Sequence, residues 1–244
     1  MRKFFVEDST IKNNKVFISG EDVNHIKNVL RLKVGDNIIV SNGKCSEYEV
    51  QIKDISSIIE GQIIQKIENN SEPSVDITLF QGIPKGEKME LIIQKAVEVG
   101  VKKIIPVITE RVIVKLDEKS AEKKAERWQK ISEQAAKQCG RNVIPEVSQP
   151  ISYNQALKIL ESYDLALVLY EKEKDKTLKE ILSELSNIPQ RIAVFIGPEG
   201  GFSDKEAELV SRFIIISLGP RILRTETAGL VAVSIILYQA GDLG

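Results

Sequence analysis

The stretch IAVFIGPEGG, residues 192–201, decides the fold of the larger part of this chain. Its first half, residues 192–196, is an uninterrupted apolar run with the length of a buried strand. Ser203-Asp204-Lys205-Glu206 follows with the pattern of a helix start, in which Glu206 takes the capping-box position. The glycines in between admit positive φ and let backbone groups approach a ligand closely. The sequence therefore predicts a strand, a tight loop and a helix in succession.

A second loop of the same kind follows, LGPRILR at residues 218–224. The β-prone residues 213–217 precede it, and an apolar helix begins after it at Thr225. We expect both loops at the carboxyl ends of parallel strands, where open α/β sheets bind ligands. Neither loop matches the dinucleotide fingerprint or the P-loop, and no lysine accompanies Glu199 to balance its charge beside a phosphate. On spacing alone, a nucleotide-like ligand and tight packing without a ligand both stay open.

From residue 75 onward strands and helices alternate, which predicts an α/β fold with a parallel sheet. The last helix is apolar on nearly every side, so we expect it to thread the centre of the fold or to pack against a second subunit. The expected strands are 76–81, 103–108, 165–170, 191–196 and 213–217, and the expected helices are 85–99, 120–138, 154–162, 177–185, 204–212 and 225–240.

Residues 1–72 show a different pattern, in which short β-prone runs are separated by turns. The dipeptide Asn42-Gly43 is a strong hairpin signal. A polar, proline-containing segment, residues 69–74, separates this compact β-barrel-like module from the rest. We therefore divide the chain into domains 1–72 and 73–244. In the first, strands are expected at 3–6, 16–19, 37–41, 48–52 and 58–67, and a short helix at 22–30.

The composition is that of a globular protein, with 244 residues, a formal net charge of −1 and 42% hydrophobic residues. Cys45, Cys139 and the sole histidine, His25, lack the close spacing of a zinc site, so no metal is expected. The N-terminus turns acidic before any apolar signal region develops. The longest late apolar run, 230–237, is too short for a membrane span. We expect a cytoplasmic protein without a membrane partner.

Several sequence phrases spread over the chain occur together with the GPEGG loop. They are HIKNVLR at 25–31, PKGEKME at 84–90, QKAVEVGV at 94–101, TER at 109–111, QCGR at 138–141 and LRTETA at 223–228. Together they closely resemble the RsmE family of 16S rRNA uridine N3-methyltransferases, members of the SPOUT superfamily. The resemblance implies a PUA-like N-terminal RNA-binding β-barrel and a SPOUT methyltransferase domain that ends in a trefoil knot. It also implies a homodimer with the cofactor site near the subunit interface.

By the same resemblance the cofactor is S-adenosylmethionine, whose sulfonium group needs no phosphate-binding motif. The two glycine loops would form most of its pocket, with backbone groups holding the adenine and leucine and isoleucine side chains adding apolar contact. The residues expected to line the pocket are Tyr170, Glu171, Ile196, Gly197, Pro198, Glu199, Gly200, Leu218, Gly219, Ile222, Leu223 and Arg224.

Methylation at N3 of uridine requires an unpaired or flipped base, because N3 lies on the Watson–Crick edge. We assign Arg224 to stabilise the uridine anion, since a guanidinium group stays charged at any working pH. Glu226 is a candidate for the general base or for a residue that orients Arg224. The alternative is that Glu226 only stabilises the first turn of its helix, where a negative charge interacts favourably with the helix dipole. The identity of the proton acceptor stays open.

The resemblance implies 16S rRNA as the partner, within the small ribosomal subunit. Whether free RNA or the assembled particle is the substrate stays open, as does joint action of the two dimer sites. Two rival functions are a ribose 2'-O-methyltransferase of the same superfamily and a non-catalytic RNA-binding assembly factor. For the lysine and arginine side chains of the predicted helix 120–138, the alternative to RNA contact is that they form a solvent-exposed helix face. The residues expected to contact RNA are Arg2, Lys27, Arg31, Lys85, Arg111, Lys137, Gln138 and Arg141.

Overall fold

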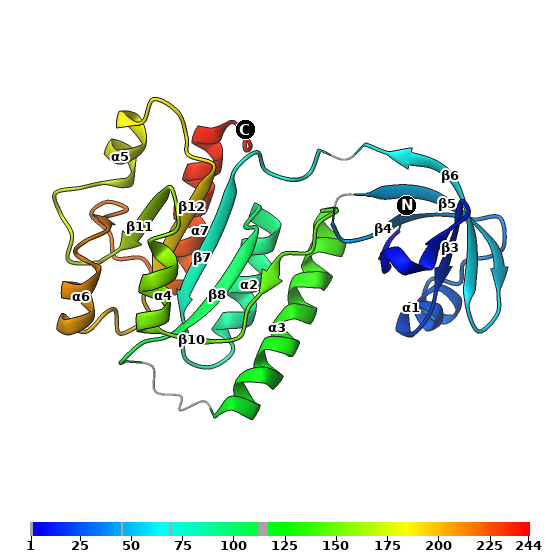
Figure 1. Cartoon of the computed structure of the whole chain (residues 1–244), viewed down its shortest axis with the longest axis horizontal. Coiled ribbons are helices and arrows are strands. Elements are labelled where there is room, and N and C mark those ends of the chain that lie inside the picture. Colours follow the sequence, from blue (N-terminus) through cyan, green and yellow to red (C-terminus); the bar gives the residue numbers. More distant parts are fainter. Residues whose placement is uncertain (1, 45, 69, 112–116) are drawn as a thin grey trace. The chain divides into compact units, whose positions relative to one another are not determined.

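The computed structural model describes residues 2–44, 46–68, 70–111 and 117–244 of the chain. They divide into two compact units, each with its own sheet (Figure 1). The first unit consists of residues 1–72 and 136–144, and the second of residues 73–135 and 145–244. Residues 136–144 thus belong with the first unit, although the sequence pattern groups them with the second.

The first unit is built on a six-stranded sheet in the order β1-β4-β5-β6-β3-β2. β1 and β4 are parallel, and the other neighbours are antiparallel. The strands enclose a core in which Ile26, Val40 and Val50 are fully buried. The elements are β1 (Lys3–Phe5), η1 (Asp8–Thr10), β2 (Ile11–Lys12), β3 (Lys15–Ile18), α1 (Glu21–Asn24), η2 (His25–Val29), β4 (Asn37–Ser41), β5 (Glu47–Ile55) and β6 (Ile59–Ile67).

Two turns set the register of this sheet. The predicted hairpin at Asn42-Gly43 is confirmed, because it joins the antiparallel strands β4 and β5 and Gly43 has a φ of 71°. A second hairpin joins β2 to β3 through Asn13 and Asn14, with φ values of 50° and 62°. Asparagine tolerates this left-handed conformation better than most residues. The sequence pattern missed β2 because a strand of two residues shows no alternation.

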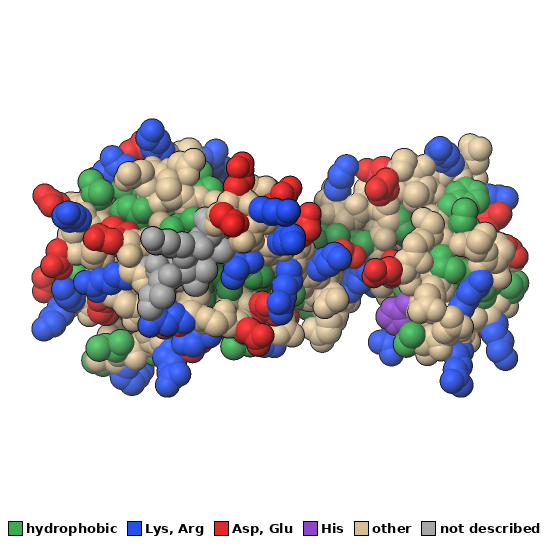
Figure 2. Space-filling model, turned by 90° about the horizontal axis from the view of Figure 1, so that it is seen from below, with side chains coloured by type: hydrophobic (Ala, Val, Ile, Leu, Met, Phe, Trp, Pro, Cys, Tyr) green, Lys and Arg blue, Asp and Glu red, His purple; other side chains and the backbone are tan. Residues whose placement is uncertain are grey.

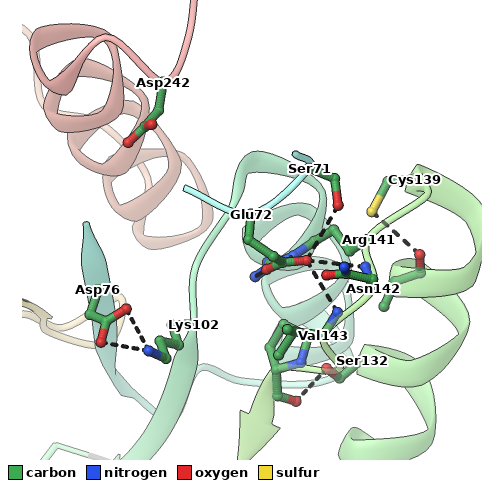
Figure 3. Close-up of polar contacts among 12 residues, drawn as sticks. Ser71, Glu72, Asp76, Lys102, Ser132, Cys139, Arg141, Asn142, Val143 and Asp242 are labelled. Atoms are coloured by element: carbon green, nitrogen blue, oxygen red, sulfur yellow. Dashed lines mark hydrogen bonds and ion pairs between the residues drawn. The ribbon is translucent and has the colours of Figure 1, made fainter. Parts of the chain in front are cut away.

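Residues 136–144 are held in the first unit by an ionic cluster around Glu72 (Figure 3). The Arg141 guanidinium donates to Glu72 Oε2 from Nη2 at 2.6 Å and from Nε at 3.1 Å. The backbone N–H groups of Asn142 and Val143 donate to Oε1 at 3.1 and 3.2 Å. Only 3% of Arg141 is exposed. Arg141, which we expected to contact RNA, therefore lies in an ion pair of the protein itself.

A second buried ion pair fastens the same segment. Lys3 Nζ lies 2.8 Å from Glu47 Oε2 and donates to the Gly140 carbonyl at 2.8 Å. Ser41 Oγ donates to the Asn142 carbonyl at 3.0 Å. These contacts join β1, β4 and β5 to residues 136–144, and they explain why this segment belongs to the first unit.

Replacing Arg141 by methionine is expected to lower the free energy of unfolding by about 1.5–3 kcal/mol, because Glu72 loses its charged donors. Urea unfolding measures the change. Arg127→Met is the matched control, since Arg127 pairs with Glu90 at 2.7 Å but leaves 63% of its side chain exposed. Exposed pairs of this kind contribute about 0–1 kcal/mol. Equal losses in the two variants would contradict a special role for Arg141.

The second unit is built on a parallel sheet in the order β10-β8-β7-β12-β11-β13, with β9 beside β8. The described pairings are all parallel, which confirms the predicted α/β class. The elements are β7 (Asp76–Gly82), α2 (Lys88–Val99), β8 (Lys103–Ile108), α3 (Glu118–Cys139), β9 (Glu146–Val147), β10 (Ile151–Ser152), α4 (Tyr153–Leu160), β11 (Leu165–Leu169), α5 (Leu178–Glu184), β12 (Arg191–Ile196), α6 (Asp204–Val210), β13 (Ile214–Ile216) and α7 (Thr225–Ala240).

Helices cover both faces of this sheet, with α4 and α7 on opposite sides (Figure 1). Phe195 of β12 packs against Tyr153 of α4, with ring centroids 5.8 Å apart. On the other face, Gly229 of α7 lies close to Leu79 and Ile196, since a Cβ there would be 3.4 and 3.5 Å from their side chains. One face of α7 thus packs against β7 and β12, while Ile235 and Tyr238 of the same helix are exposed.

Candidate active site

A cavity of about 1030 Å³ opens at the carboxyl ends of β11, β12 and β13. Its wall consists mainly of the loops after β12 and β13, the residues after β11 and the first turn of α7. The structure brings all the residues expected to bind the cofactor onto this one wall. They are Tyr170, Glu171, Ile196, Gly197, Pro198, Glu199, Gly200, Leu218, Gly219, Ile222, Leu223 and Arg224.

The hydroxyl group of Thr225 ties the two loops to the sheet. Thr225 Oγ1 donates to the Gly197 carbonyl at 2.7 Å and accepts from Gln81 Nε2 at 2.8 Å. Gln81, at the end of β7, is fully buried and also donates to the Gly82 carbonyl at 2.9 Å. Because buried polar groups keep their hydrogen bonds, this chain of contacts fixes the peptide plane where the first loop begins. Neither Gln81 nor Thr225 was among the site residues predicted from the sequence.

Two glycines give the loops their shape. A Cβ at Gly82 would lie 2.6 Å from Pro198 Cδ and 2.7 Å from the Pro198 nitrogen, so the first loop lies directly on the end of β7. Gly219, in the second loop, has a φ of 108°, a conformation that other residues rarely adopt. The loops therefore present backbone groups rather than side chains over part of the cavity wall.

Glu206 anchors the far end of the first loop. The predicted capping box is confirmed, since Ser203 and Glu206 bond each other's backbone N–H groups at the start of α6. Glu206 Oε1 also accepts from the backbone N–H of Glu110 at 2.8 Å, and the Tyr153 hydroxyl donates to the Glu206 carbonyl at 2.7 Å. Burial raises the pKa of Tyr153 above its usual value, which further favours the protonated hydroxyl that donates this hydrogen bond.

Lys88, the first residue of α2, brings a positive charge to the cavity wall. Its Nζ lies 3.0 Å from Glu199 Oε1 and 3.4 Å from Glu226 Oε2. The Lys85 backbone N–H lies 3.2 Å from each Glu199 oxygen and donates to the carboxylate. Burial by itself raises the pKa of Glu199, but the backbone N–H of Glu199, the Lys88 ammonium and the Lys85 N–H outweigh burial and lower it. Glu199 therefore has a compensating lysine, which its own loop sequence lacks.

Arg224 and Glu226 stand at the start of α7 without pairing to each other. Arg224 is the N-cap residue and is exposed on the cavity wall. Among the described residues, its guanidinium makes no hydrogen bond or ion pair. Glu226 is directed to Lys88 instead, and its Oε2 is buried without a hydrogen-bond donor in the described part of the chain. Among the described residues, no contact supports the predicted role of Glu226 in orienting Arg224.

The residues expected to contact RNA are distributed over both units. In the first unit, Arg2, Arg31 and Gln138 are exposed, Lys27 donates to the Ser56 carbonyl, and Lys137 lies 3.6 Å from Asp22. On the face drawn in Figure 2, lysine and arginine side chains are interspersed with aspartate and glutamate on each unit.

In the second unit, Lys85 and Arg111 are exposed. The Arg111 guanidinium donates to the Gly200 carbonyl, and a Cβ at Gly200 would lie 3.3 Å from Arg111 Cδ. Arg111 thus lies against the first loop of the cavity, next to the wall residues that were expected to bind the cofactor.

The described residues contain no group of three or more histidine, cysteine, aspartate and glutamate side chains placed to hold a metal ion. Cys139 is a free thiol, and Cys45 lies outside the residues that the structure describes. No helix in the ranges given above has the length and apolar character that crossing a bilayer requires.

Comparisons with known proteins agree with this architecture. Residues 70–237 match the RNA methyltransferase domain family, and residues 18–59 match the RNA methyltransferase PUA domain family. The chain is 38% identical to the ribosomal RNA small subunit methyltransferase E of Bacillus subtilis (strain 168), with 98% of this chain and 97% of that protein covered. It is 30% identical to the protein of the same name from Aquifex aeolicus (strain VF5), with 97% and 99% covered.

Among solved structures, one similar chain is a ribosomal RNA small subunit methyltransferase E from Neisseria gonorrhoeae bound to S-adenosyl methionine. The TM-score is 0.86 and the identity 33%, with 97% of this chain and 96% of that chain covered. The fold and the matched domains define an RNA methyltransferase with a PUA domain. More closely, the chain belongs to the ribosomal RNA small subunit methyltransferase E family, which confirms the resemblance found in its motifs.

Replacing Thr225 by valine is expected to lower the free energy of unfolding by about 1–3 kcal/mol, because the Gly197 carbonyl and the Gln81 amide then lose a buried partner. Thr225→Ser keeps the hydroxyl and removes one methyl group, which costs about 0.8 kcal/mol. Urea unfolding compares the two variants. A serine variant less stable than the valine variant would show that the hydroxyl does not hold this junction.

Proposed function

We propose that this chain transfers a methyl group from S-adenosylmethionine to N3 of a uridine in 16S rRNA of the small ribosomal subunit. The observation that carries the proposal is the cavity at the carboxyl ends of β11, β12 and β13, where two glycine loops meet Arg224, whose guanidinium has no ion pair among the described residues. The family to which the chain belongs is named for ribosomal RNA of the small subunit. This substrate places the proposed activity in the cytoplasm.

The residues of the cavity fit this cofactor. A volume of about 1030 Å³ is at the upper end of the range of about 300–1,000 Å³ for small-molecule pockets, which leaves room for part of a nucleotide. Leu218, Ile222 and Leu223 provide apolar surface, and 84% of Ile222 is exposed for a ligand to cover. Backbone groups of the two loops can bind the polar edge of an adenine. The similar chain from Neisseria gonorrhoeae is a structure with this cofactor bound.

When bound, the cofactor supplies an electrophilic methyl group on a sulfonium. The Arg224 guanidinium would stabilise the negative charge that uridine gains when N3 loses its proton. A guanidinium keeps its charge throughout the working pH range, so this stabilisation does not depend on a proton transfer. Since N3 lies on the Watson–Crick edge, the base must enter the cavity unpaired. Holding N3 in line with the methyl group adds an entropic contribution.

We propose that the first unit binds RNA as a PUA-like β-barrel, in which exposed Arg2 and Arg31 meet phosphate groups. The match of residues 18–59 to the RNA methyltransferase PUA domain family supports this role. The six strands of the sheet share one apolar core, which supports a barrel-like curvature.

We further propose a C-terminal trefoil knot and a homodimer. The support for the knot is that β13 pairs with β11, whereas α7 returns to β12 and begins beside Gly197. The support for the dimer is apolar surface on α2 and α7, two helices that pack together: Leu91 and Ile235 are exposed, and Tyr238 is exposed by 69%. A second copy that covers this surface would lie near the cavity, and light scattering of the purified chain measures its presence.

The proposed function is tested with labelled S-adenosylmethionine and two substrates, free unmodified 16S rRNA and unmodified small-subunit particles. Nuclease digestion and mass analysis then locate the label. The expected product is uridine methylated on the base at N3. A methyl group on the ribose 2'-oxygen would identify the rival methyltransferase activity instead. RNA binding without any transfer, together with no binding of the cofactor in calorimetry, would identify a non-catalytic assembly factor.

Replacing Arg224 by alanine is expected to lower kcat by about a hundredfold, the usual effect of losing one group that stabilises a developing anion. The rate of transfer under saturating cofactor measures the change. Arg212→Ala is the control, because Arg212 pairs with Glu161 at 2.8 Å on the surface of the second unit. Unchanged rates in the Arg224 variant would remove this residue from the chemical step.

A further inference from the structure

Lys88 occupies a position that helix formation does not explain. It is the first residue of α2, after the N-cap residue Glu87. The positive end of the helix dipole disfavours a cation in the first turn. A residue that breaks a local rule in a cavity wall is a candidate for a functional role. Lys88 is also the α2 residue that lines the cavity in the described structure.

The Lys88 ammonium joins two elements that carry the proposed cofactor and substrate groups. One contact is to Glu199 in the loop after β12, at 3.0 Å, and the other to Glu226 in the first turn of α7, at 3.4 Å. Glu226 Oε2 is buried, and no described residue donates a hydrogen bond to it. Lys88 therefore supplies the positive charge that faces this oxygen. Loss of Lys88 would remove the cation that, in the described structure, contacts both carboxylates.

The other charged groups around Lys88 do not replace it. Within α2, Glu90 is paired with Arg127 at 2.7 Å, and Glu87 adds a further negative charge beside the N-terminus. Arg224 is exposed on the cavity wall and, among the described residues, has no ion pair with either Glu199 or Glu226. Lys85 contacts Glu199 through its backbone N–H rather than through its ammonium group.

We propose that Lys88 is a positioning residue for methyl transfer, whose ammonium group holds Glu199 and Glu226 together and thereby keeps the start of α7, with Arg224, against the cofactor loop. The catalytic part of this proposal rests on the function proposed above. The positioning part rests on the contacts of Lys88 alone. Lys88 is not the proton acceptor, because its hydrogen bond to Glu199 raises the pKa of the ammonium group above its usual value.

The first arm of the test needs neither cofactor nor RNA. Carboxyl carbon resonances of Glu199 are titrated by NMR in the wild type, Lys88→Met and Lys88→Arg. The Lys88 ammonium is one of the groups that lower the pKa of Glu199, so its removal is expected to move this titration to higher pH. Arginine keeps the charge and is expected to restore most of the wild-type curve. An unchanged titration in Lys88→Met would overturn the proposal whatever the protein does to RNA.

The second arm measures the pH profile of kcat with the RNA substrate that the wild type methylates. Lys88→Met is expected to lower kcat by about 10- to 100-fold, the effect of misplacing reacting groups by about 1 Å. It is also expected to move the acidic limb of the profile to higher pH, with rescue by Lys88→Arg. Lys95→Met is the matched control on α2, where Lys95 pairs with Glu98 at 2.7 Å.

The two arms of the test distinguish a failure of the positioning role of Lys88 from a failure of the proposed function. A uniform loss of rate with an unmoved acidic limb would mean that Lys88 only supports the fold, and it would overturn the positioning role. A wild type that methylates no RNA, combined with the expected shift in the Glu199 titration, would overturn the proposed function and leave the Lys88 contact in place.

Discussion

The hydrogen bond from Thr225 Oγ1 to the Gly197 carbonyl is the contact on which the candidate active site depends. It joins the end of β12 to the start of α7, and the Gln81 amide extends the junction to β7. A hydroxyl group is suited to this place, because it donates to one buried group while it accepts from another. Through this junction the first loop, the cavity wall and Arg224 are placed relative to the parallel sheet.

Charge is arranged around this junction in a way that suits the proposed reaction, in which a cationic cofactor meets a uridine that loses its N3 proton. Glu199 keeps its negative charge through backbone donors and Lys88, and Glu226 shares the same lysine. Arg224 stays unpaired within the described residues, so it is available to a ligand. A guanidinium that is already bound to a carboxylate would first have to give up that partner, whereas Arg224 needs no such exchange. Arg141 of the first unit differs from Arg224, because its guanidinium is already bound to Glu72.

Much of this fold follows from local sequence signals. The buried strand at 192–196, the capping box at Ser203 and Glu206 and the apolar helix at 225–240 are all recognisable because their causes lie within a few residues. The two loops of the cavity wall were also recognised, because both carry glycine and follow strands, and the resemblance to the RsmE family supplied the residues expected to line the pocket. Lys88, Gln81 and residues 136–144 were not, since each acts through a contact far away in sequence. Gln81 and Thr225, for example, are separated by 144 positions. Periodicity carries no information on such pairs.

Hydrogen exchange of the whole chain with and without S-adenosylmethionine, read by mass spectrometry on short peptides, tests the cofactor site most directly. We expect slower exchange in the loops at 197–203 and 217–224 and in the first turn of α7, which form most of the cavity wall. No comparable change is expected in the sheet of the first unit. Protection confined to the first unit, or unchanged exchange in both loops at saturating cofactor, would contradict the assignment of this cavity as the cofactor site.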